Sequence, residues 1–356
     1  MTKKALIAMS GGVDSSVAAY LTQRSGIACM GATMRLFDKT PGGGEGKCCS
    51  LDDVEDARSV AYRLGMPFYV FNYTEQFRHQ VMDKFVRCYE CGLTPNPCID
   101  CNRYLKFEAL LLRAQTLECD YIVTGHYARI EEENGRYFLK KAMDSAKDQT
   151  YFLYSLTQHQ LSHTLFPLGN LTKEEVRAIA QENGFINARK RDSQDVCFIP
   201  GGDYFEFLQQ YTGKDYPAGD FLDMDGNVVG RHRGAIAYTR GQRKGLGLAM
   251  GKPVYVSGKD MKKNTVTVCE NEKLFSTSLL ADDWNFFPFD TLSAPLRCKA
   301  KARSRMAEQP ATVYPEKNGI CRVVFDEPQR ALTTGQAVVL YDGDTVLGGG
   351  TILQVL

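Results

Sequence analysis

The feature that most constrains the fold is a loop rich in glycine and serine near the N-terminus. It has the sequence SGGVDSS from Ser10, directly after a short apolar run and directly before a stretch that favours a helix. Glycines at positions 11 and 12 let the backbone curl, so that several N–H groups can converge on one anion. The positive end of the following helix points at the same place. This strand–loop–helix unit predicts a phosphate-binding site, and it lacks the lysine of the Walker loop.

Apolar runs alternate with helical periodicity through the first half of the chain. The runs at 3–9, 27–36, 67–71 and 120–124 predict strands, and the stretches at 15–22, 54–64, 75–88 and 104–117 predict helices. Such alternation is typical of an α/β domain with a parallel sheet. The segment 38–49 contains Pro-Gly-Gly-Gly, which predicts a loop insertion. Thr172 and Glu175 form a capping box that starts a further helix, and Gly184 ends it.

After Pro200 the sequence changes to short strands separated by turns such as Lys317-Asn-Gly. We therefore expect three domains. The first is an α/β catalytic domain over 1–206, the second a small linking domain over 207–276, and the third a β-barrel-like domain over 277–356.

Charge and composition exclude several classes of protein. The chain has 43 Lys and Arg against 42 Asp and Glu, so any nucleic-acid binding must come from local patches. No apolar run approaches the roughly 18 residues of a membrane helix, and the first residues turn glycine-rich before a signal-peptide core develops. Twelve cysteines among 356 residues are too dilute for a disulfide scaffold. We expect a cytoplasmic protein with no membrane association, whose cysteines are thiols or a reactive set.

Three cysteines stand out. Cys98 and Cys101 precede a predicted helix, and Cys197 lies 96 residues further on. A thiol beside a helix N-terminus has a lowered pKa, and two thiols brought together can pass sulfur through a persulfide and a disulfide. A zinc half-site and an iron–sulfur cluster held by all three cysteines are alternatives. We expect the pairs Cys88–Cys91 and Cys48–Cys49 to be structural.

Basic residues occupy alternate positions in the C-terminal part. They are Arg297, Lys299, Lys301, Arg303 and Arg305, with small or apolar residues between them. At a strand period of two, all five charges would face one way and match a phosphate backbone. Because natural surfaces usually intersperse both signs, we favour RNA binding over a solvated strand face.

Taken together, several strings resemble the tRNA-specific 2-thiouridylase family of PP-loop ATP pyrophosphatases. They are SGGVDSS, CCSLDDVEDA, TPNPCIDCN, TGHYAR, KDQTYFL, SQDVCFIP, YTRGQRKGLG and, more loosely, KARSR and TTGQ, which span residues 8 to about 336. The resemblance implies a parallel-sheet, adenine-nucleotide alpha-hydrolase-like domain, with tRNA-contacting central and barrel domains. It also implies ATP-dependent adenylation, with release of AMP and pyrophosphate. Persulfide sulfur would then pass to C2 of the wobble uridine (position 34) of the glutamate, glutamine and lysine tRNAs.

The resemblance also assigns roles to individual positions. Cys101 matches the nucleophile and Cys197 the persulfide carrier, and Asp14 is expected to hold Mg²⁺. The implied ATP-binding residues are Ala8, Met9, Ser10, Gly11, Gly12, Val13, Asp14, Ser15, Met34 and Gly125. The implied tRNA-contacting residues are Asn96, Pro97, Cys98, His126, Lys147, Asp148, Gln149, Arg303, Ser304 and Gln336. A cysteine desulfurase or sulfur-relay protein would supply the sulfur, and family habit implies a monomer.

One position departs from the family pattern, which most often has Asp where this chain has Cys98. That Asp is assigned an acid–base role, and Asp100 is displaced from it by two residues. The extra thiol favours a variant with a [4Fe–4S] cluster on Cys98, Cys101 and Cys197. Two rival functions stay open. One is a PP-loop ligase that adenylates a carboxylate, and the other is an RNA-binding or sulfur-storage protein that only holds a nucleotide.

Overall fold

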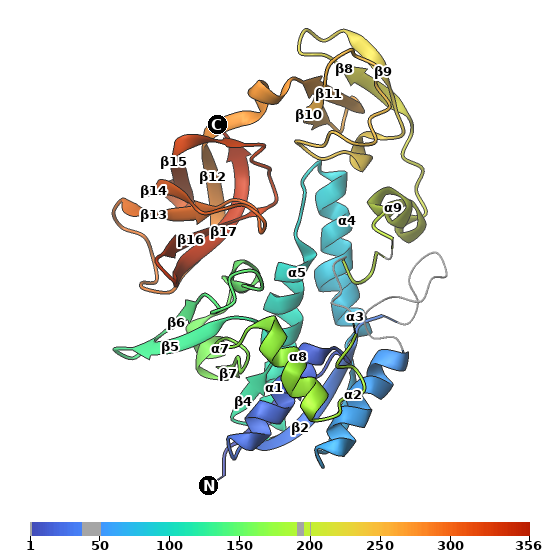
Figure 1. The fold of residues 1–356 in the computed structure, drawn as a ribbon. Helices are drawn as coiled ribbons and strands as arrows, with labels where there is room; N and C mark the ends of the chain where they lie inside the picture. Colours follow the sequence, from blue (N-terminus) through green and yellow to red (C-terminus); the bar gives the residue numbers. More distant parts are fainter. Residues whose placement is uncertain (1, 38–50, 191–195, 200) are drawn as a thin grey trace.

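The computed structural model describes residues 2–37, 51–190, 196–199 and 201–356 (Figure 1). The predicted loop insertion, with Cys48 and Cys49, lies outside the described residues, as do Asp192 to Asp195. No helix in the described part of the chain is both long and apolar enough to cross a membrane.

A parallel five-stranded sheet forms the first part of the chain. Its strands are β1 (Lys4–Ala8), β2 (Ala28–Arg35), β3 (Phe68–Asn72), β4 (Tyr121–Val123) and β7 (Thr164–Leu165). They lie in the order β3-β2-β1-β4-β7, and every neighbouring pair is parallel. The central residues of β1 are fully buried, as expected for a strand covered on both faces. The predicted parallel α/β sheet is confirmed.

Three helices pack near this sheet. They are α1 (Val13–Arg24), α2 (Leu51–Arg63) and α8 (Lys173–Glu182). The capping box that the sequence predicts at Thr172 and Glu175 is present, and Gly184 follows the helix with a left-handed φ of 62°. A shorter helix, α7 (Gln158–Ser162), begins with a second capping box at Thr157.

Two longer helical stretches contain π-helical turns, which lie inside each stretch. The first comprises α3 (Thr74–Phe77), η1 (Arg78–Met82) and α4 (Asp83–Glu90), and the second α5 (Pro97–Asp100), η2 (Cys101–Ala109) and α6 (Leu110–Thr116). The second begins seven residues before the predicted start at 104, because Asn96 caps it and Pro97 occupies its first position. Figure 1 shows α4 extending from the parallel sheet toward the central domain.

The central part has its own four-stranded sheet, preceded by α9 (Tyr204–Thr212). Its strands are β8 (Gly219–Leu222), β9 (Val228–His232), β10 (Tyr255–Asp260) and β11 (Thr265–Cys269), in the order β10-β11-β8-β9. Phe221, Tyr238 and Val266 belong to a separate apolar cluster, so this part has its own small core.

The C-terminal strands close into a barrel, as the sequence predicts. They are β12 (Phe275–Phe286), β13 (Leu296–Lys301), β14 (Gln309–Pro315), β15 (Cys321–Arg330), β16 (Ala337–Asp342) and β17 (Thr345–Val355). Their order is β12-β15-β14-β13-β16-β17, and β12 also pairs with β17, which closes the barrel. The hairpin of β5 (Arg129–Glu133) and β6 (Arg136–Lys140) joins it where Lys140 pairs with Thr345. Short 3₁₀ turns lie at Thr150–Phe152, Ala235–Ala237, Asn271–Leu274 and Lys317–Gly319.

The prediction that five alternating charges share one strand face is wrong. β13 ends at Lys301, and the chain then turns, with Met306 N–H bonded to the Arg303 carbonyl. Arg297 is paired with Asp326, and the Lys301 ammonium lies over the Tyr341 ring. The intervening Cys298, Ala300 and Ala302 are buried as predicted. The alternation in the sequence continues past the point where the backbone leaves the sheet.

Candidate functional site

The glycine-rich loop lies between the end of β1 and the start of α1, as predicted. Gly11 has φ of +74°, and a side chain there would collide with the backbone of Asp53. Gly125, after β4, packs so closely that a Cβ would lie 2.7 Å from the Ser15 backbone nitrogen. Two glycines far apart in the sequence therefore form one surface at the carboxyl edge of the sheet, where open α/β sheets bind ligands. Met34, near the carboxyl end of β2, is buried at the same edge.

Hydrogen bonds fix the shape of this loop. The hydroxyls of Ser15 and Ser16 donate to the Gly12 carbonyl at 3.0 and 3.1 Å, and Ser15 Oγ accepts from the Ser10 N–H. Asn187 Nδ2 donates to the Gly11 carbonyl at 3.0 Å and to Ser16 Oγ at 2.9 Å. The loop is thus held in its curled shape before any ligand enters.

Asp14, predicted to hold Mg²⁺, makes an ion pair that the sequence did not predict. Lys173 Nζ lies 2.7 and 2.8 Å from its two carboxylate oxygens, and the Tyr127 hydroxyl donates to one of them at 2.9 Å. Lys173 is 5% exposed. Mg²⁺ is commonly held by one or two carboxylates together with substrate phosphates, so a single carboxylate at the phosphate loop fits that ion.

A second lysine at the loop was also missed. Lys190 Nζ lies 2.6 Å from Asp53 Oδ1, 2.6 Å from Asp56 Oδ2 and 3.4 Å from the Gly11 carbonyl oxygen. The only signal for Lys173 was its place directly after the predicted N-cap Thr172, since a helix N-terminus is a usual neighbour of anions. No signal in the sequence pointed to Lys190.

His126, predicted to contact tRNA, is buried beside the loop at 9% exposure. Its Nδ1 lies 2.7 Å from Thr124 Oγ1, and its Nε2 lies 3.4 Å from Lys106 Nζ. Burial and the Lys106 charge lower the pKa of His126 well below its usual value. The ring is therefore neutral, and because Lys106 can only donate, Nε2 accepts and Nδ1 carries the proton.

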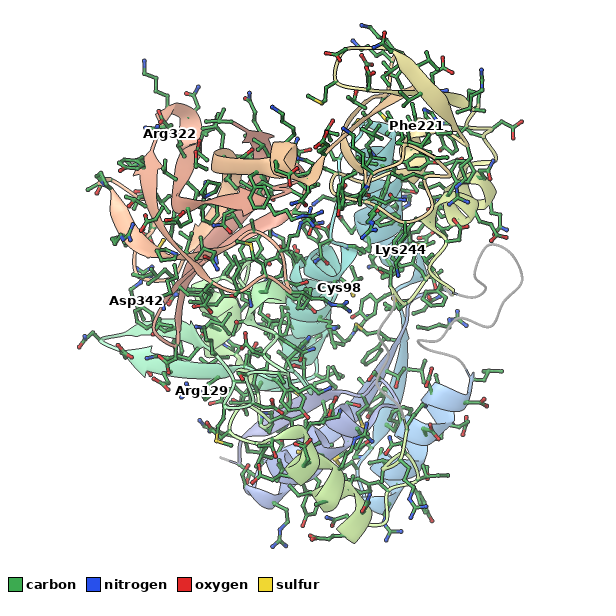
Figure 2. The ribbon with its side chains drawn as sticks, turned by 45° about the horizontal axis from the view of Figure 1, so that its top comes forward. Cys98, Arg129, Phe221, Lys244, Arg322 and Asp342 are labelled. Carbon is green, nitrogen blue, oxygen red and sulfur yellow. The ribbon has the colours of Figure 1, made fainter. Side chains whose placement is uncertain are left out.

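The segment with the first two cysteines starts a helix. Asn96 Oδ1 accepts the Cys98 N–H at 3.2 Å. Cys98 is exposed and Cys101 is partly buried. They are three residues apart and therefore share one helix face. Figure 2 shows Cys98 near the middle of the molecule, between the barrel and the helices of the α/β part.

Asp100 lies on another face of this helix. Its carboxylate pairs with Lys84 Nζ of α4 at 2.6 Å, and it is 7% exposed. Burial raises the pKa of Asp100 despite the opposing charge of Lys84. Because successive helical residues point about 100° apart, residues 98 and 100 diverge by roughly 200°. Asp100 therefore does not take the place of an acid at position 98.

The barrel holds the segment that precedes this helix. The Thr94 N–H donates to the Thr334 carbonyl at 3.0 Å, and Gln336 Nε2 donates to the Thr94 carbonyl at 2.7 Å. Predicted tRNA-contacting residues from distant parts of the sequence, Asn96, Pro97 and Gln336, are thereby brought together.

These residues line a cavity of about 660 Å³, which is formed by all three parts of the chain. Its walls include Thr94, Pro95, Asn96 and Pro97, then Val196, Asp203 and Tyr204, and then Arg233, Thr239, Gln242 and Gln336. Val196 directly precedes Cys197, and Cys197 and Cys101 pack against the same apolar core cluster. The residues next to Cys98 and Cys197, Pro97 and Val196, therefore line one cavity, whereas the lining does not include Cys98, Cys101 or Cys197 themselves.

The other predicted tRNA-contacting residues form internal bonds. Asp148, which directly follows Lys147, accepts hydrogen bonds from the Ala142 N–H and the Thr150 hydroxyl. Gln149 Oε1 accepts a hydrogen bond from the Tyr127 N–H. Arg303, which precedes Ser304, donates to Thr333 Oγ1 at 2.6 Å and to the Arg240 carbonyl at 3.3 Å. These contacts hold loops together in the structure described here.

Among the described residues, no three His, Cys, Asp or Glu side chains are grouped so that they could hold a metal ion. Cys98, Cys101 and Cys197 are all described, and they do not form a ligand set in this arrangement. The residues therefore do not fit the iron–sulfur cluster that the sequence left open.

A parallel sheet with a curled SGGVDSS loop at its carboxyl edge defines a PP-loop protein of the ATP-using kind, here with a C-terminal six-stranded barrel. Three family models match in succession. They are the tRNA methyl transferase HUP domain over 3–201, the tRNA methyl transferase PRC-barrel domain over 205–270, and the aminomethyltransferase beta-barrel domain over 276–352. Curated relatives that are about 50% identical along the whole chain are named tRNA-specific 2-thiouridylase, so the chain belongs to the tRNA-specific 2-thiouridylase (MnmA) family.

Curated relatives match over almost the whole length. The tRNA-specific 2-thiouridylase MnmA of Clostridium acetobutylicum is 50% identical, covering 99% of this chain and 100% of the relative. That of Clostridioides difficile is 49% identical, over 100% and 99%. Among solved structures, a 4-thiouridine synthetase–RNA complex with bound ATP is 19% identical with a TM-score of 0.36, covering 58% of this chain and 50% of that one.

Proposed function

We propose that this protein is an ATP-dependent tRNA 2-thiouridylase that modifies the wobble uridine (position 34) of the glutamate, glutamine and lysine tRNAs. The observation that carries the proposal is the cavity between the three parts of the chain, into which the segment before Cys98 and Cys101 and the residue before Cys197 both open. Relatives that are about 50% identical along the whole chain are named tRNA-specific 2-thiouridylase MnmA. The volume of about 660 Å³ is within the usual range for a small-ligand site.

The first half-reaction is adenylation. The loop from Ala8 to Ser15 binds the ATP phosphates through converging N–H groups and the N-terminus of α1, while Met34 and Gly125 border the adenine. Asp14 would hold the Mg²⁺ that accompanies ATP, and that ion would shield the phosphate charge. The C2 oxygen of the extruded uridine attacks the α-phosphate, and pyrophosphate leaves. The oxygen becomes part of an AMP leaving group, which is far easier to expel.

The second half-reaction transfers sulfur. Cys197 accepts sulfane sulfur from a cysteine desulfurase or relay protein and becomes a persulfide. The Cys101 thiolate attacks Cys197 Sγ, so that a Cys101–Cys197 disulfide forms and hydrosulfide is released. Hydrosulfide adds to C2 and AMP departs. A thiol reductant then supplies the two electrons that restore both thiols. In a second version, the terminal persulfide sulfur attacks C2 directly and Cys101 resolves the adduct.

The helix that begins near Cys98 connects the cavity to the nucleotide loop. Lys106 lies five residues beyond Cys101 in the same helical stretch, and it contacts His126, the neighbour of Gly125. We propose Asn96–Cys98, His126, Lys147–Gln149, Arg303, Ser304 and Gln336 as contacts of the bound tRNA. Because Asp148, Gln149 and Arg303 make internal bonds here, contact would require these loops to rearrange.

We take residues 1–206 as the catalytic domain, with tRNA-contacting domains over 207–276 and 277–356, in a cytoplasmic monomer. The monomer is tested by light scattering at micromolar concentration. Residues 206 and 276 lie inside α9 and β12, so limited proteolysis should separate the parts at the neighbouring exposed segments, around 201–203 and 270–273.

The decisive experiment replaces Cys197 with Ser, with Cys91→Ser as the matched control at an exposed thiol. Release of pyrophosphate that depends on tRNA should survive in both variants, and 2-thiouridine should disappear only in Cys197→Ser. Thiolation by Cys197→Ser would refute the carrier role.

Two further results would favour the rival functions. Normal turnover of a Cys101→Ser, Cys197→Ser double variant with a carboxylate substrate would favour a PP-loop ligase. Absence of pyrophosphate release with every tRNA offered would point to a protein that only binds RNA or stores sulfur.

A further inference from the structure

Two lysines reach the glycine-rich loop from outside it, in different ways. Lys173 is buried, and both oxygens of Asp14 hold its ammonium group. Lys190 instead pairs with one oxygen from Asp53 and one from Asp56, and its side chain is 35% exposed. Lys173 is therefore fixed in place, whereas the Lys190 ammonium lies where it can exchange one set of oxygens for another.

The backbone that carries Lys190 is anchored. Arg177 Nη1 donates to the carbonyls of Ala188 and Lys190, at 3.1 Å each. Asn187, three residues earlier, binds both the Gly11 carbonyl and Ser16 Oγ. The Cα of Lys190 is thus fixed beside the phosphate loop, and its ammonium is already 3.4 Å from the Gly11 carbonyl oxygen. We expect a rotation of the Lys190 side chain to bring its ammonium over the mouth of the loop, since this group already lies beside Gly11.

The charges explain why such a move would be favoured. The carboxylates of Asp14, Asp53 and Asp56 and the ammonium groups of Lys173 and Lys190 sum to one negative charge. ATP brings about four more at neutral pH, and one Mg²⁺ offsets two of them. The loop itself has no lysine. The phosphate oxygens of a bound nucleotide therefore compete with Asp53 and Asp56 for the Lys190 ammonium, since all of them accept charge-assisted hydrogen bonds from it.

We propose that Lys190 is the phosphate-binding lysine that the loop lacks. In the nucleotide-free enzyme Asp53 and Asp56 hold its ammonium. When MgATP enters, the ammonium moves to the β- and γ-phosphate oxygens, where it stabilises the pyrophosphate that leaves during adenylation. This inference rests on the proposed use of ATP, but it concerns binding of the pyrophosphate moiety and requires neither tRNA nor sulfur.

The test measures binding by calorimetry with three probes: Mg²⁺ with inorganic pyrophosphate, a non-hydrolysable ATP analogue with Mg²⁺, and AMP. Lys190→Met should weaken binding of pyrophosphate and of the ATP analogue by tenfold or more. It should leave AMP binding within twofold, because AMP has no β- or γ-phosphate. Lys190→Arg should recover part of the loss. Lys4→Met, at the opposite end of β1, is the matched control and should change none of the three.

A double variant, Asp53→Asn with Asp56→Asn, separates this role from a structural one. If Lys190 moves to phosphate, removing its two competitors should tighten pyrophosphate binding several-fold. If Lys190 only fastens α2 to the loop, the double variant should weaken binding as Lys190→Met does, and that outcome would overturn the inference. An equal loss of AMP and pyrophosphate binding in Lys190→Met would also overturn it. Failure of the wild-type protein to bind any nucleotide would instead count against the proposed function.

Discussion

Replacing Asp14 with Asn should destabilise the protein more than an ordinary surface change. The substitution removes the Asp14 carboxylate from the Lys173 ammonium, and Lys173 is only 5% exposed. Two unit charges 2.7 Å apart attract by about 6 kcal/mol at an effective dielectric constant near 20. Desolvation offsets part of this, and breaking a buried pair by removing one partner costs about 3 kcal/mol or more. We therefore expect Asp14→Asn to lower the free energy of unfolding of the α/β part by about 3 kcal/mol.

The assay is a double-mutant cycle in urea, followed by circular dichroism. Lys173→Met should cost less, about 1–2 kcal/mol, because the Asp14 side chain remains 31% exposed and keeps access to water. The double variant should cost less than the sum of the two single variants, with a coupling energy of about 2 kcal/mol. Additive effects would refute the reasoning, since they would mean that the pair contributes no interaction of its own.

The other predictions concern a contact between the barrel and the α/β part and a buried lysine within the central part. Gln336→Leu removes the donor to the Thr94 carbonyl and should reduce the kcat/KM of tRNA thiolation about fivefold, at a cost of about 1 kcal/mol; Gln354→Leu, exposed on β17, is the control. Burial lowers the pKa of Lys259, whose ammonium donates to the Tyr238 carbonyl, to about 8. Since this pKa is below that of the unfolded chain, the unfolded state binds the extra proton above pH 8. Stability should therefore rise between about pH 8 and 10, and Lys259→Met should abolish that rise in pH-dependent urea titrations.

Most of the α/β part could be predicted because its signals are local. Periodicity located β1, β2, α1 and the capping box of α8, and each of these patterns needs only neighbouring residues. The alternation of strands and helices then required a parallel sheet. The five alternating charges misled the prediction, because period two indicates a strand but cannot tell where the chain leaves the sheet after Lys301.

The candidate site was predictable only in its ligand-facing loops. Residues such as Gly11 and Asn96 belong to compact motifs whose chemistry is visible in a few letters. Lys190 and Asp53, by contrast, are 137 positions apart, and only the folded chain brings their charged atoms to 2.6 Å. The charge balance of the loop therefore had to come from the structure.

The structure also shows how the thiol at position 98 lies relative to Asp100, the nearest acidic side chain in the sequence. The side-chain oxygen Oδ1 of Asn96 accepts a hydrogen bond from the N–H of Cys98, so Cys98 occupies the first turn of a helix with its side chain exposed. The Asp100 carboxylate forms an ion pair with Lys84, so it lies on the face of its helix that is turned toward α4. An acid that protonates or deprotonates the substrate must reach it through the cavity, and Asp100 is directed away from the face that Cys98 presents. We therefore expect that proton transfer in the proposed reaction does not depend on Asp100, and that a Lys84→Met variant lowers stability while leaving the pH profile of thiolation unchanged.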